Sequence, residues 1–416
     1  MAFKGTSGTI RPAVVVSGAR TPTGVFGGSL SNIDSPYLGA TVIKEVLKRA
    51  NVPGEAVEEV IIGTHFQAGI KANAARQCAM YAGLPDSVPA WTPNKNCATG
   101  MKAVQSAAQQ VMLGEVDVII GGGSETMSRV PYVLHGHRFG IRMGPGTFNE
   151  KGEQTVIRAE LLDSMFYDGL VDPFMNYHMG ITAENVAAKC GITRAMQDEF
   201  ALNSHLKAQA AAEAGRFKDE IVPVEIKSRK GPALFEADET IRINAKLEDF
   251  SKLKPVFKKE GGTVTAGNAS PINDAASAVL IMSEDKAKEY GLKPRLYFRG
   301  FQAAAVHPSI MGYAPVFAVQ KLLAKSGLKK EDIDLFELNE AFAAQAVACA
   351  QDLKLDFNKV NVNGGAVALG HPVGSSGCRL IVTLMYEMER RNARYGIATL
   401  CIGGGQGLAT LVERPA

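Results

Sequence analysis

Near its N-terminus the chain reads Val46-Leu-Lys-Arg-Ala-Asn-Val-Pro-Gly-Glu-Ala-Val-Glu-Glu-Val-Ile-Ile62, and near its C-terminus it reads Leu322-Leu-Ala-Lys-Ser-Gly-Leu-Lys-Lys-Glu-Asp-Ile-Asp-Leu-Phe-Glu-Leu338. Each stretch has the pattern of a helix end, a turn, an acidic segment and a buried strand. Farther along each half, a glycine triplet follows an apolar run, at Gly121–Gly123 and at Gly403–Gly405. Because the parts recur in the same order, the sequence predicts two similar α/β domains.

Shorter patterns fill in the first of these domains. Apolar and β-branched runs predict buried strands, while apolar residues at three- and four-residue spacing predict amphipathic helices. The expected strands are 13–17, 59–63 and 116–123, the last running into a glycine turn, and the expected helix is 38–50. Strands that alternate with helices form βαβ units, so we expect a mainly parallel sheet.

Between residues 127 and 271 the sequence is more polar and irregular. It carries one segment with a weak helical pattern, 153–169, and two Ala-rich helices within 182–215, the second entered through a capping-box-like Thr193 and Gln197. This region is polar enough to lie across a ligand rather than to build its own core. We therefore expect a first core domain at 1–126 and 272–293, an inserted loop domain at 127–271, and a second core domain at 294–416.

Composition narrows the class of protein. A chain of 416 residues is too long for a single hydrophobic core. The formal charge of +3 gives no reason to expect a nucleic-acid partner. The six cysteines show neither metal-site spacing nor a disulfide framework, which favours a reducing compartment. The start, Met1–Arg11, lacks an apolar signal region, and runs such as Val116–Ile120 are too short to span a membrane. A cytoplasmic enzyme without a metal is expected.

The first candidate for chemistry is Cys97, in the stretch Asn94-Lys-Asn-Cys-Ala-Thr-Gly-Met-Lys-Ala-Val104. A helix is expected over 101–113, so Cys97 lies at or just before its N-terminus. Free amide donors there stabilise an anion, which predicts a thiol pKa below the usual value of about 8.5. The alternative is a buried structural cysteine. By the offset of the repeat, Cys97 corresponds to the loop that holds His371, and pseudo-twofold packing of the halves would make the two residues face each other.

Three later stretches also look unlike core. Glu337-Leu-Asn-Glu-Ala-Phe342 places Asn339 at a strand end, where its alternative role is a helix N-cap. His371 sits in the glycine-rich run Asn361–Gly377, and Cys401 precedes a second glycine cluster. Neither glycine cluster completes a GxGxxG or Walker A motif, so dinucleotide binding is rejected. A papain-like hydrolase would use Cys97 with His371, but it leaves Cys401 without a role.

At these residues the sequence resembles the thiolase family. Six blocks occur in the family's order over about residues 13–412: Asn96-Cys-Ala-Thr-Gly100, Tyr177-His-Met-Gly180, Thr263-Val-Thr-Ala-Gly-Asn-Ala-Ser270, Asn339-Glu-Ala-Phe342, Gly370-His-Pro-Val-Gly374 and Cys401-Ile-Gly-Gly-Gly405. The block at Tyr177, with Gly180–Glu184 after it, is similar to the biosynthetic branch. The resemblance implies an α/β fold with two similar βαβαβ-type domains in five layers and an inserted loop domain.

The resemblance also implies a role for each matching residue. Cys97 would be the acylated nucleophile and His371 its base, while Cys401 would remove an α-proton from the second substrate molecule. Asn339, through a water, and His371 would hold the enolate oxygen, and the amides of Cys97 and Gly403 would hold the tetrahedral oxyanion. The implied coenzyme A contacts, some of which have core packing or a solvated charge as their alternative, are His178, Met179, Arg242, Val256, Phe257, Ala266, Ser270, Ala341 and Phe342.

The activity that the resemblance implies is the reversible condensation of two acetyl-CoA molecules to acetoacetyl-CoA and CoA. The alternatives are a thiolase that cleaves longer 3-ketoacyl-CoA chains, a ketoacyl synthase, which should lack Cys401, and a non-catalytic CoA-binding protein. No bound cofactor, nucleic acid or membrane partner is expected, and a homotetramer is the family's expectation. The sequence departs from the family pattern at Thr99, Asp249 and Pro271, and in a longer 144–163 segment.

Overall fold

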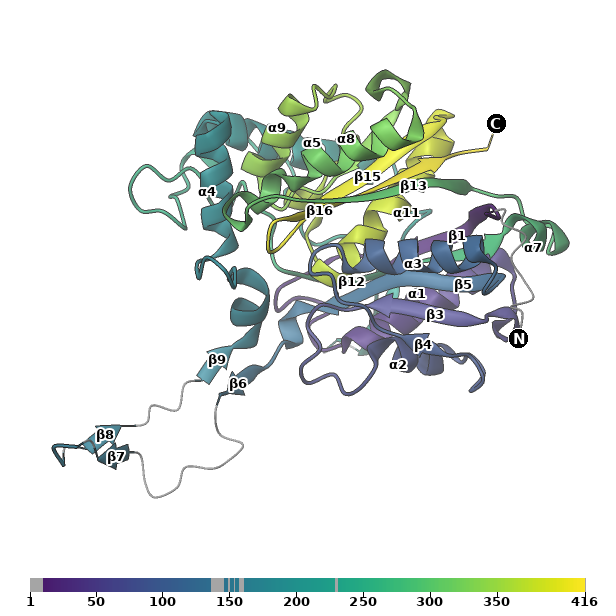
Figure 1. Ribbon diagram of the computed structural model, residues 1–416, viewed down its shortest axis with the longest axis horizontal. Coiled ribbons are helices and arrows are strands. Elements are labelled where there is room, and N and C mark those ends of the chain that lie inside the picture. The colour runs from purple at the N-terminus through teal and green to yellow at the C-terminus, as the bar shows by residue number, and fades with distance from the viewer. Residues whose placement is uncertain are drawn as a thin grey trace.

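Two helices from opposite halves of the chain lie side by side in the middle of the molecule. They are α3 (Thr99–Leu113) and α11 (Val373–Arg391), which pack against each other in the computed structural model. The structure describes residues 10–135, 146–148, 150–152, 154–156, 161–228 and 231–415. Both helices lie between two halves of a large sheet, as Figure 1 shows. The middle helical layer is therefore shared by the two halves of the chain.

The sheet runs continuously through both halves in the order β14-β15-β16-β13-β1-β12-β5-β3-β4, with β2 paired to β12. Its halves meet where Val14 and Val15 pair with Tyr297 and Leu296. The strands of the first half are β1 (Ala13–Arg20), β2 (Gly24–Val25), β3 (Glu59–Gly63), β4 (Ala90–Trp91), β5 (Val118–Thr126) and β12 (Asn273–Ser283). Those of the second half are β13 (Leu296–Ala305), β14 (Leu335–Leu338), β15 (Tyr395–Ile402) and β16 (Gln406–Glu413).

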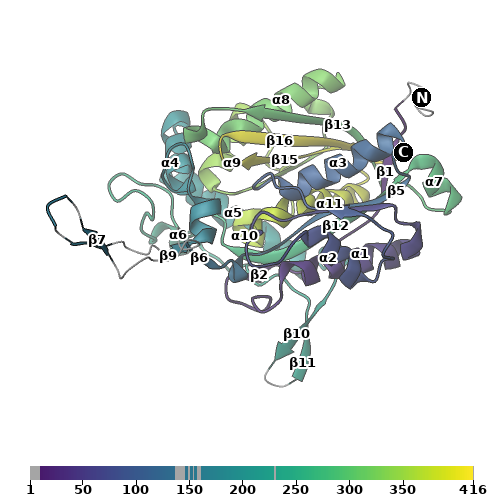
Figure 2. The same ribbon diagram turned by 60° about the horizontal axis from the view of Figure 1, so that its bottom comes forward.

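Further helices cover the outer faces of the sheet. On the first half these are α1 (Ser35–Ala50) and α2 (Ala74–Ala82), and on the second half they are α8 (Ala314–Ser326) and α9 (Ala343–Asp352). Figure 2 shows the succession of helix, sheet, helix, sheet and helix. This is the expected five-layer arrangement. Short helices connect the layers: η1 (Gly54–Ala56), α7 (Glu284–Glu289), η5 (Pro308–Tyr313), η6 (Lys330–Asp332) and α10 (Ala366–Leu369).

The repeat seen in the sequence is a repeat of structure. The first copy is the end of α1, then η1 and β3, and the second copy is the end of α8, then η6 and β14. The strand expected at 59–63 is confirmed as β3, with the same first and last residues. The first strand, β1, and the first helix, α1, begin and end close to the residues expected for them. The glycine triplets are not equivalent: Gly403–Gly405 form a turn, but Gly121–Gly123 lie inside β5, so the expected turn there is wrong.

The expectation of a mainly parallel sheet is also wrong. Only β3 with β4, β3 with β5, and β14 with β15 pair in parallel among the named strands. The longest pairings, such as β12 with β5 and β13 with β16, are antiparallel. The cause is that β12 and β16 return into the sheet beside the βαβ strands. In β12 every residue is buried, so no alternation marked it as a strand.

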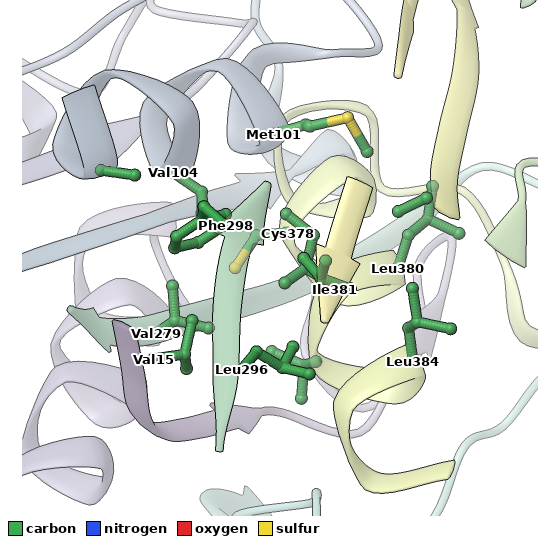
Figure 3. Packing of buried hydrophobic residues seen from close by; sticks show 14 of the residues in the cluster. Val15, Met101, Val104, Val279, Leu296, Phe298, Cys378, Leu380, Ile381 and Leu384 are labelled. Atoms are coloured by element: carbon green, nitrogen blue, oxygen red, sulfur yellow. The ribbon is translucent and has the colours of Figure 1, made fainter. Parts of the chain in front are cut away.

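The core of the middle layer is made by both halves of the chain. Met101 and Val104 of α3, Cys378 and Ile381 of α11, and Phe298 of β13 belong to one buried cluster, which Figure 3 shows. Glycines let the helix starts approach closely: a Cβ on Gly100 would lie 2.7 Å from the carbonyl oxygen of Gly374. Burial of this apolar surface, at about 25 cal/mol per Å², fixes the N-termini of the two helices next to each other.

The region 127–271 packs against the second half of the sheet and its helices. Helices α4 (Met179–Cys190) and α5 (Arg194–Glu213) confirm the two Ala-rich helices, and α5 packs on α9 and α10. The hydroxyl of Thr193 accepts a hydrogen bond from the Met196 amide, but Gln197 donates to Thr263 instead of closing a capping box. The other elements are η2 (Met127–Arg129), β6 (Tyr132–Leu134), β7 (Gly146–Phe148), β8 (Gln154–Val156), β9 (Leu161–Asp163), η4 (Phe166–Leu170), β10 (Val224–Ser228), β11 (Gly231–Phe235) and α6 (Leu247–Ser251).

The helix expected over 153–169 is wrong for most of its length. Among the described residues, β8 and β9 occupy part of it, and helical structure is confined to its end, around η4. Residues 153 and 157–160, and 144–145 and 149 of the longer 144–163 segment, lie outside the described residues. Within the described ranges no helix is long and apolar enough to cross a membrane, and no cluster of His, Cys, Asp and Glu could hold a metal ion.

Candidate active site

One cavity of about 520 Å³ lies where the two halves and the inserted region meet. Its walls come from the start of α3, the loop before α11, the turn after β15, the start of α4 and the segment 256–272. Of the site residues that the resemblance implied, those that line it are Cys97, His178, Met179, Val256, Phe257, Ala266, Ser270, Ala341, Phe342, His371 and Gly403. Residues from stretches as distant as 97 and 403 therefore share one site.

Cys97 lies two residues before α3, as expected, but its thiol is not easily ionised. Burial raises the pKa of Cys97 to about 11, and the backbone amides of Gly403 and of Cys97 itself act in the opposite direction. The expectation of a lowered pKa is therefore wrong, because removal from water destabilises the thiolate more than the nearby amide donors stabilise it. Pairing with the Gly403 amide joins the nucleophile candidate to the turn after β15.

His371 lies in the loop that leads into α11, which is the position of Cys97 relative to α3. Its backbone amide donates to Asn273 Oδ1 at 2.9 Å, and its Nδ1 lies 2.7 Å from Ser376 Oγ. Since Ser376 Oγ donates its proton to the carbonyl of Pro372, it accepts from His371 Nδ1–H. The lone pair is then on Nε2, which is buried and has no partner among the described residues.

The charge state of His371 follows from its burial. Burial lowers the pKa of His371 to about 4, with smaller contributions from Arg379 and His65. At neutral pH the ring is therefore uncharged and able to accept a proton at Nε2. The predicted proximity of Cys97 and His371 is confirmed to the extent that both line the same cavity.

Asn339 and Cys401 lie just behind the cavity wall. Asn339 follows β14, and its Nδ2 is 3.5 Å from His371 Nδ1 while its Oδ1 has no partner among the described residues. It is not a helix N-cap, because α9 begins four residues later, at Ala343, and its N-cap is Phe342. Cys401 is fully buried near the end of β15, and its pKa is raised well above the usual value by burial and next by Cys97. The two thiols are thus close enough to affect each other's ionisation.

The expected coenzyme A contacts, apart from Arg242, line the cavity and are mostly apolar. His178 caps α4 by accepting the Gly180 amide at 2.9 Å, and its ring stacks on Phe257 with centroids 4.4 Å apart. Phe342 meets Phe257 edge to face. The Ser270 hydroxyl donates to the carbonyl of Ala341 at 3.0 Å, which ties two walls together. Such a channel, apolar with few polar groups, suits a flexible aliphatic arm.

Two outlying residues are placed away from the cavity. Arg242 is exposed, with its guanidinium 5.5 Å from the centre of the Phe250 ring, so its expected contact with coenzyme A stays a prediction. Asp249 accepts the amide of Lys246 and pairs with Lys252, which explains an acidic residue there by helix capping. Pro271 lines the cavity beside Ser270.

Two further ionisable residues of the site, His65 and Glu125, were not predicted from the sequence. His65 lines the cavity next to β3, and Glu125, near the end of β5, is buried with a raised pKa because of that burial. The Glu125 carboxylate accepts the backbone amides of His65 and Gly374, at 2.9 and 2.8 Å, and so joins the loops of the two halves. Both residues lie at the carboxyl ends of parallel neighbours, a position that could have revealed them.

The fold and the site can be compared with known proteins. The family model "Thiolase, N-terminal domain" matches residues 13–285, and "Thiolase, C-terminal domain" matches residues 292–414. A relative named acetyl-CoA acetyltransferase from Chromobacterium violaceum is 52% identical over 96% of this chain and 99% of its own length. One of the same name from Cupriavidus necator is 53% identical, with the same coverage.

A solved structure agrees with these relatives. The crystal structure of the Bacillus anthracis acetyl-CoA acetyltransferase superposes with a TM-score of 0.92 at 44% identity, and covers 98% of this chain and 100% of that one. The thiolase-like fold expected from the sequence blocks is thereby confirmed. Identity near one half over almost the whole length, together with both domain matches, leads to one conclusion: the chain belongs to the thiolase family.

Proposed function

We propose that the protein is an acetyl-CoA C-acetyltransferase that condenses two molecules of acetyl-CoA to acetoacetyl-CoA and CoA, reversibly, through an acetyl group on Cys97. Thiolases are acyltransferases, and the relatives at about half identity are named for the acetyl-CoA reaction. The observation that carries the proposal is the meeting of Cys97 with neutral His371 in one cavity, with Cys401 buried behind it.

In the first half of the reaction Cys97 Sγ attacks the thioester carbonyl of acetyl-CoA. His371 Nε2 takes the thiol proton as the new carbon–sulfur bond forms, because neither thiolate nor imidazolium is favoured beforehand. The amides of Cys97 and Gly403 stabilise the oxyanion. When the intermediate collapses, the carbon–sulfur bond to CoA breaks and the proton passes from His371 to the departing thiolate.

In the second half Cys401 acts as the base. Its proton moves to His371, and the thiolate then removes an α-proton from a second acetyl-CoA, whose enolate oxygen is held by His371 and by Asn339 through a water. The enolate carbon attacks acetyl-Cys97, the bond to Cys97 breaks, and the Cys97 thiolate recovers the proton from His371. A buried thiolate is strongly basic, which suits removal of a proton from carbon.

The first test is intact-protein mass spectrometry after brief exposure to acetyl-CoA. We expect one acetyl adduct on Cys97, absent in Cys97→Ala, and discharged by adding CoA. Cys190→Ala is the control, because Cys190 is also half-buried but lies at the far end of α4. An adduct on a different residue, or none in the wild type, would remove the basis for the covalent mechanism and favour a non-catalytic CoA-binding protein.

The alternative of a thiolase for longer chains is separated by competition. If acetoacetyl-CoA is the preferred substrate of thiolysis, longer 3-ketoacyl-CoA molecules will inhibit it weakly. If the longer 3-ketoacyl-CoA molecules are the preferred substrates, the protein is a thiolase that degrades longer chains. A cytoplasmic homotetramer without a bound cofactor completes the proposal. Sedimentation at several protein concentrations tests the assembly, and metal analysis with the absorption spectrum of the purified protein tests the last point.

A further inference from the structure

One polar side chain in the cavity wall, that of His65, has no role in the proposed reaction. His65 is only 9% exposed, yet it lines the cavity together with Cys97 and His371. Its position is fixed from both sides: its amide donates to Glu125 Oε2 at 2.9 Å, and its ring meets the Phe66 ring edge to face at 4.4 Å. A buried imidazole held this rigidly keeps both nitrogens in defined places.

The protonation pattern of the His65 ring is set by Asn94. The Asn94 amide group is fixed because its Nδ2 donates to the carbonyl of His65 at 3.1 Å and its Oδ1 accepts the Asn96 amide at 3.0 Å. That same Oδ1 lies 3.2 Å from His65 Nδ1, so Nδ1 must donate. In the uncharged ring the lone pair is then on Nε2, for which the described residues provide no hydrogen-bond donor.

Apolar groups lie around the His65 ring, in the same cavity as the nucleophile. A cluster of buried side chains, Phe66, Met127, Met165 and Val373, packs against Cys97. Gly169 of η4 forms the wall at the ring itself, since a Cβ there would lie 3.2 Å from His65 Nε2. The acyl group on Cys97 therefore enters an apolar space whose wall holds one hydrogen-bond acceptor, His65 Nε2, which has no proton to donate. Leaving such an acceptor unpaired is costly, so a ligand that donates to it is favoured.

We infer that His65 is a specificity-determining residue, and that the acyl end of the site accepts short acyl-CoA thioesters carrying a terminal hydroxyl, which donates to His65 Nε2. The inference rests on the proposed function, because the acyl group must first reach Cys97. A purely apolar pocket would instead prefer a methyl group to a hydroxyl of the same size. The acceptor reverses that preference for the chain length that reaches it.

The test compares acyl groups of nearly equal size with and without the hydroxyl. The pairs are hydroxyacetyl-CoA with propionyl-CoA, and 3-hydroxypropanoyl-CoA with butanoyl-CoA, and the rate of Cys97 acylation is followed by mass spectrometry. For the wild type we expect the hydroxylated member to react faster in at least one pair. In His65→Asn, which keeps a donor for Asn94 but lacks the Nε2 acceptor, that rate ratio should fall by about tenfold.

His65→Gln is the matched control, because its carbonyl can occupy the place of Nε2, and it should keep most of the ratio. The inference is overturned if the wild type prefers the methyl member of both pairs, or if His65→Asn leaves both ratios unchanged. Acetyl-CoA is run beside them: an acetyl adduct on Cys97 without any hydroxyl preference rejects the role of His65 alone, whereas no acetyl adduct rejects the proposed function as well.

Discussion

At the scale of single residues, the site holds its reactive groups in their uncharged forms. Burial raises the pKa of Cys97 and of Cys401 and lowers that of His371 to about 4. A thiolate–imidazolium pair is therefore not favoured before the reaction, and proton transfer must accompany attack on the thioester. Because His371 is uncharged above about pH 4, the fraction of competent base does not change across the neutral range.

Cys401→Ala should separate the two halves of the reaction. We expect the variant to form the acetyl adduct on Cys97 at a rate close to wild type, while condensation falls by about 10² to 10⁴, the usual contribution of a general base. Adduct formation is read by mass spectrometry and condensation by acetoacetyl-CoA production. Cys349→Ala, which removes another fully buried thiol, is the control. Equal losses in both steps would mean that Cys401 is needed only for the shape of the site.

Residue identity was easier to predict than residue environment. The sequence placed Cys97 before a helix, and it does precede α3, but helix position alone could not show that the side chains of Phe66 and Val373 pack against it. The same limit applies to His65, which looks like an ordinary strand-end residue until Gly169, about a hundred positions away, closes over its ring. Long-range burial decides ionisation, and a linear pattern does not contain it.

At the scale of elements, the site depends on how closely α3 and α11 begin to each other. Gly123 of β5 lies next to the N-termini of both helices. A Cβ on it would overlap the Gly374 carbonyl and lie 3.0 Å from the Gly100 Cα. The glycine triplet is thus needed for packing rather than for a turn. Its backbone needs no left-handed conformation, so space alone excludes a side chain.

Gly123→Ala should therefore be costly. Overpacking of a rigid backbone contact typically destabilises a protein by about 1–3 kcal/mol, and here the cost should reach the upper end, with a matching loss of Cys97 acylation. Denaturant unfolding gives the shift of the midpoint. The control is Gly18→Ala in β1, where the nearest obstacle is the flexible end of Met385, 2.8 Å away. Similar midpoints for the two variants would show that the contact between α3 and α11 tolerates adjustment.

Elements with a clear periodicity were predicted well, and those without it were not. The strand 59–63 and the helices within 182–215 follow from local patterns and are found there. β12 is buried throughout, and its antiparallel place beside β1 and β5 comes from a chain reversal that only tertiary packing specifies. The sheet direction was therefore wrong although its helices and strands were largely right.

At the scale of the whole molecule, a buried ion cluster fastens the inserted region to the first half. Arg20, at the end of β1, is 2% exposed; its Nε lies 2.6 Å from Glu220 Oε1, and its two terminal nitrogens lie 2.7 and 2.9 Å from the Asp238 carboxylate. Backbone hydrogen bonds between Arg20 and the segment 220–222 run alongside. This cluster therefore joins two separate parts of the region 127–271, at Glu220 and at Asp238, to the end of β1.

Arg20→Ala should leave two carboxylates buried without their partner. Breaking a buried ion pair by removing one member typically costs about 3–5 kcal/mol, so we expect a large fall in the free energy of unfolding. Arg11→Ala is the control, because Arg11 pairs with Asp117 near the surface and such pairs contribute about 0–1 kcal/mol. Thermal and denaturant unfolding measure both. If the two variants lose the same small amount, Arg20 does not hold the inserted region in place.

The shared middle layer also bears on how the chain is made. Helix α3 ends at residue 113 and its partner α11 begins at 373, so 373 − 113 = 260 positions separate them. At roughly 5–20 residues per second, a ribosome needs on the order of tens of seconds to cover that interval. During this time the emerging nucleophile has no base beside it, and the face of α3 that carries Met101 and Val104 lacks its cover. The nascent polypeptide is therefore catalytically inactive, and prone to aggregate through this apolar face, until translation is almost finished.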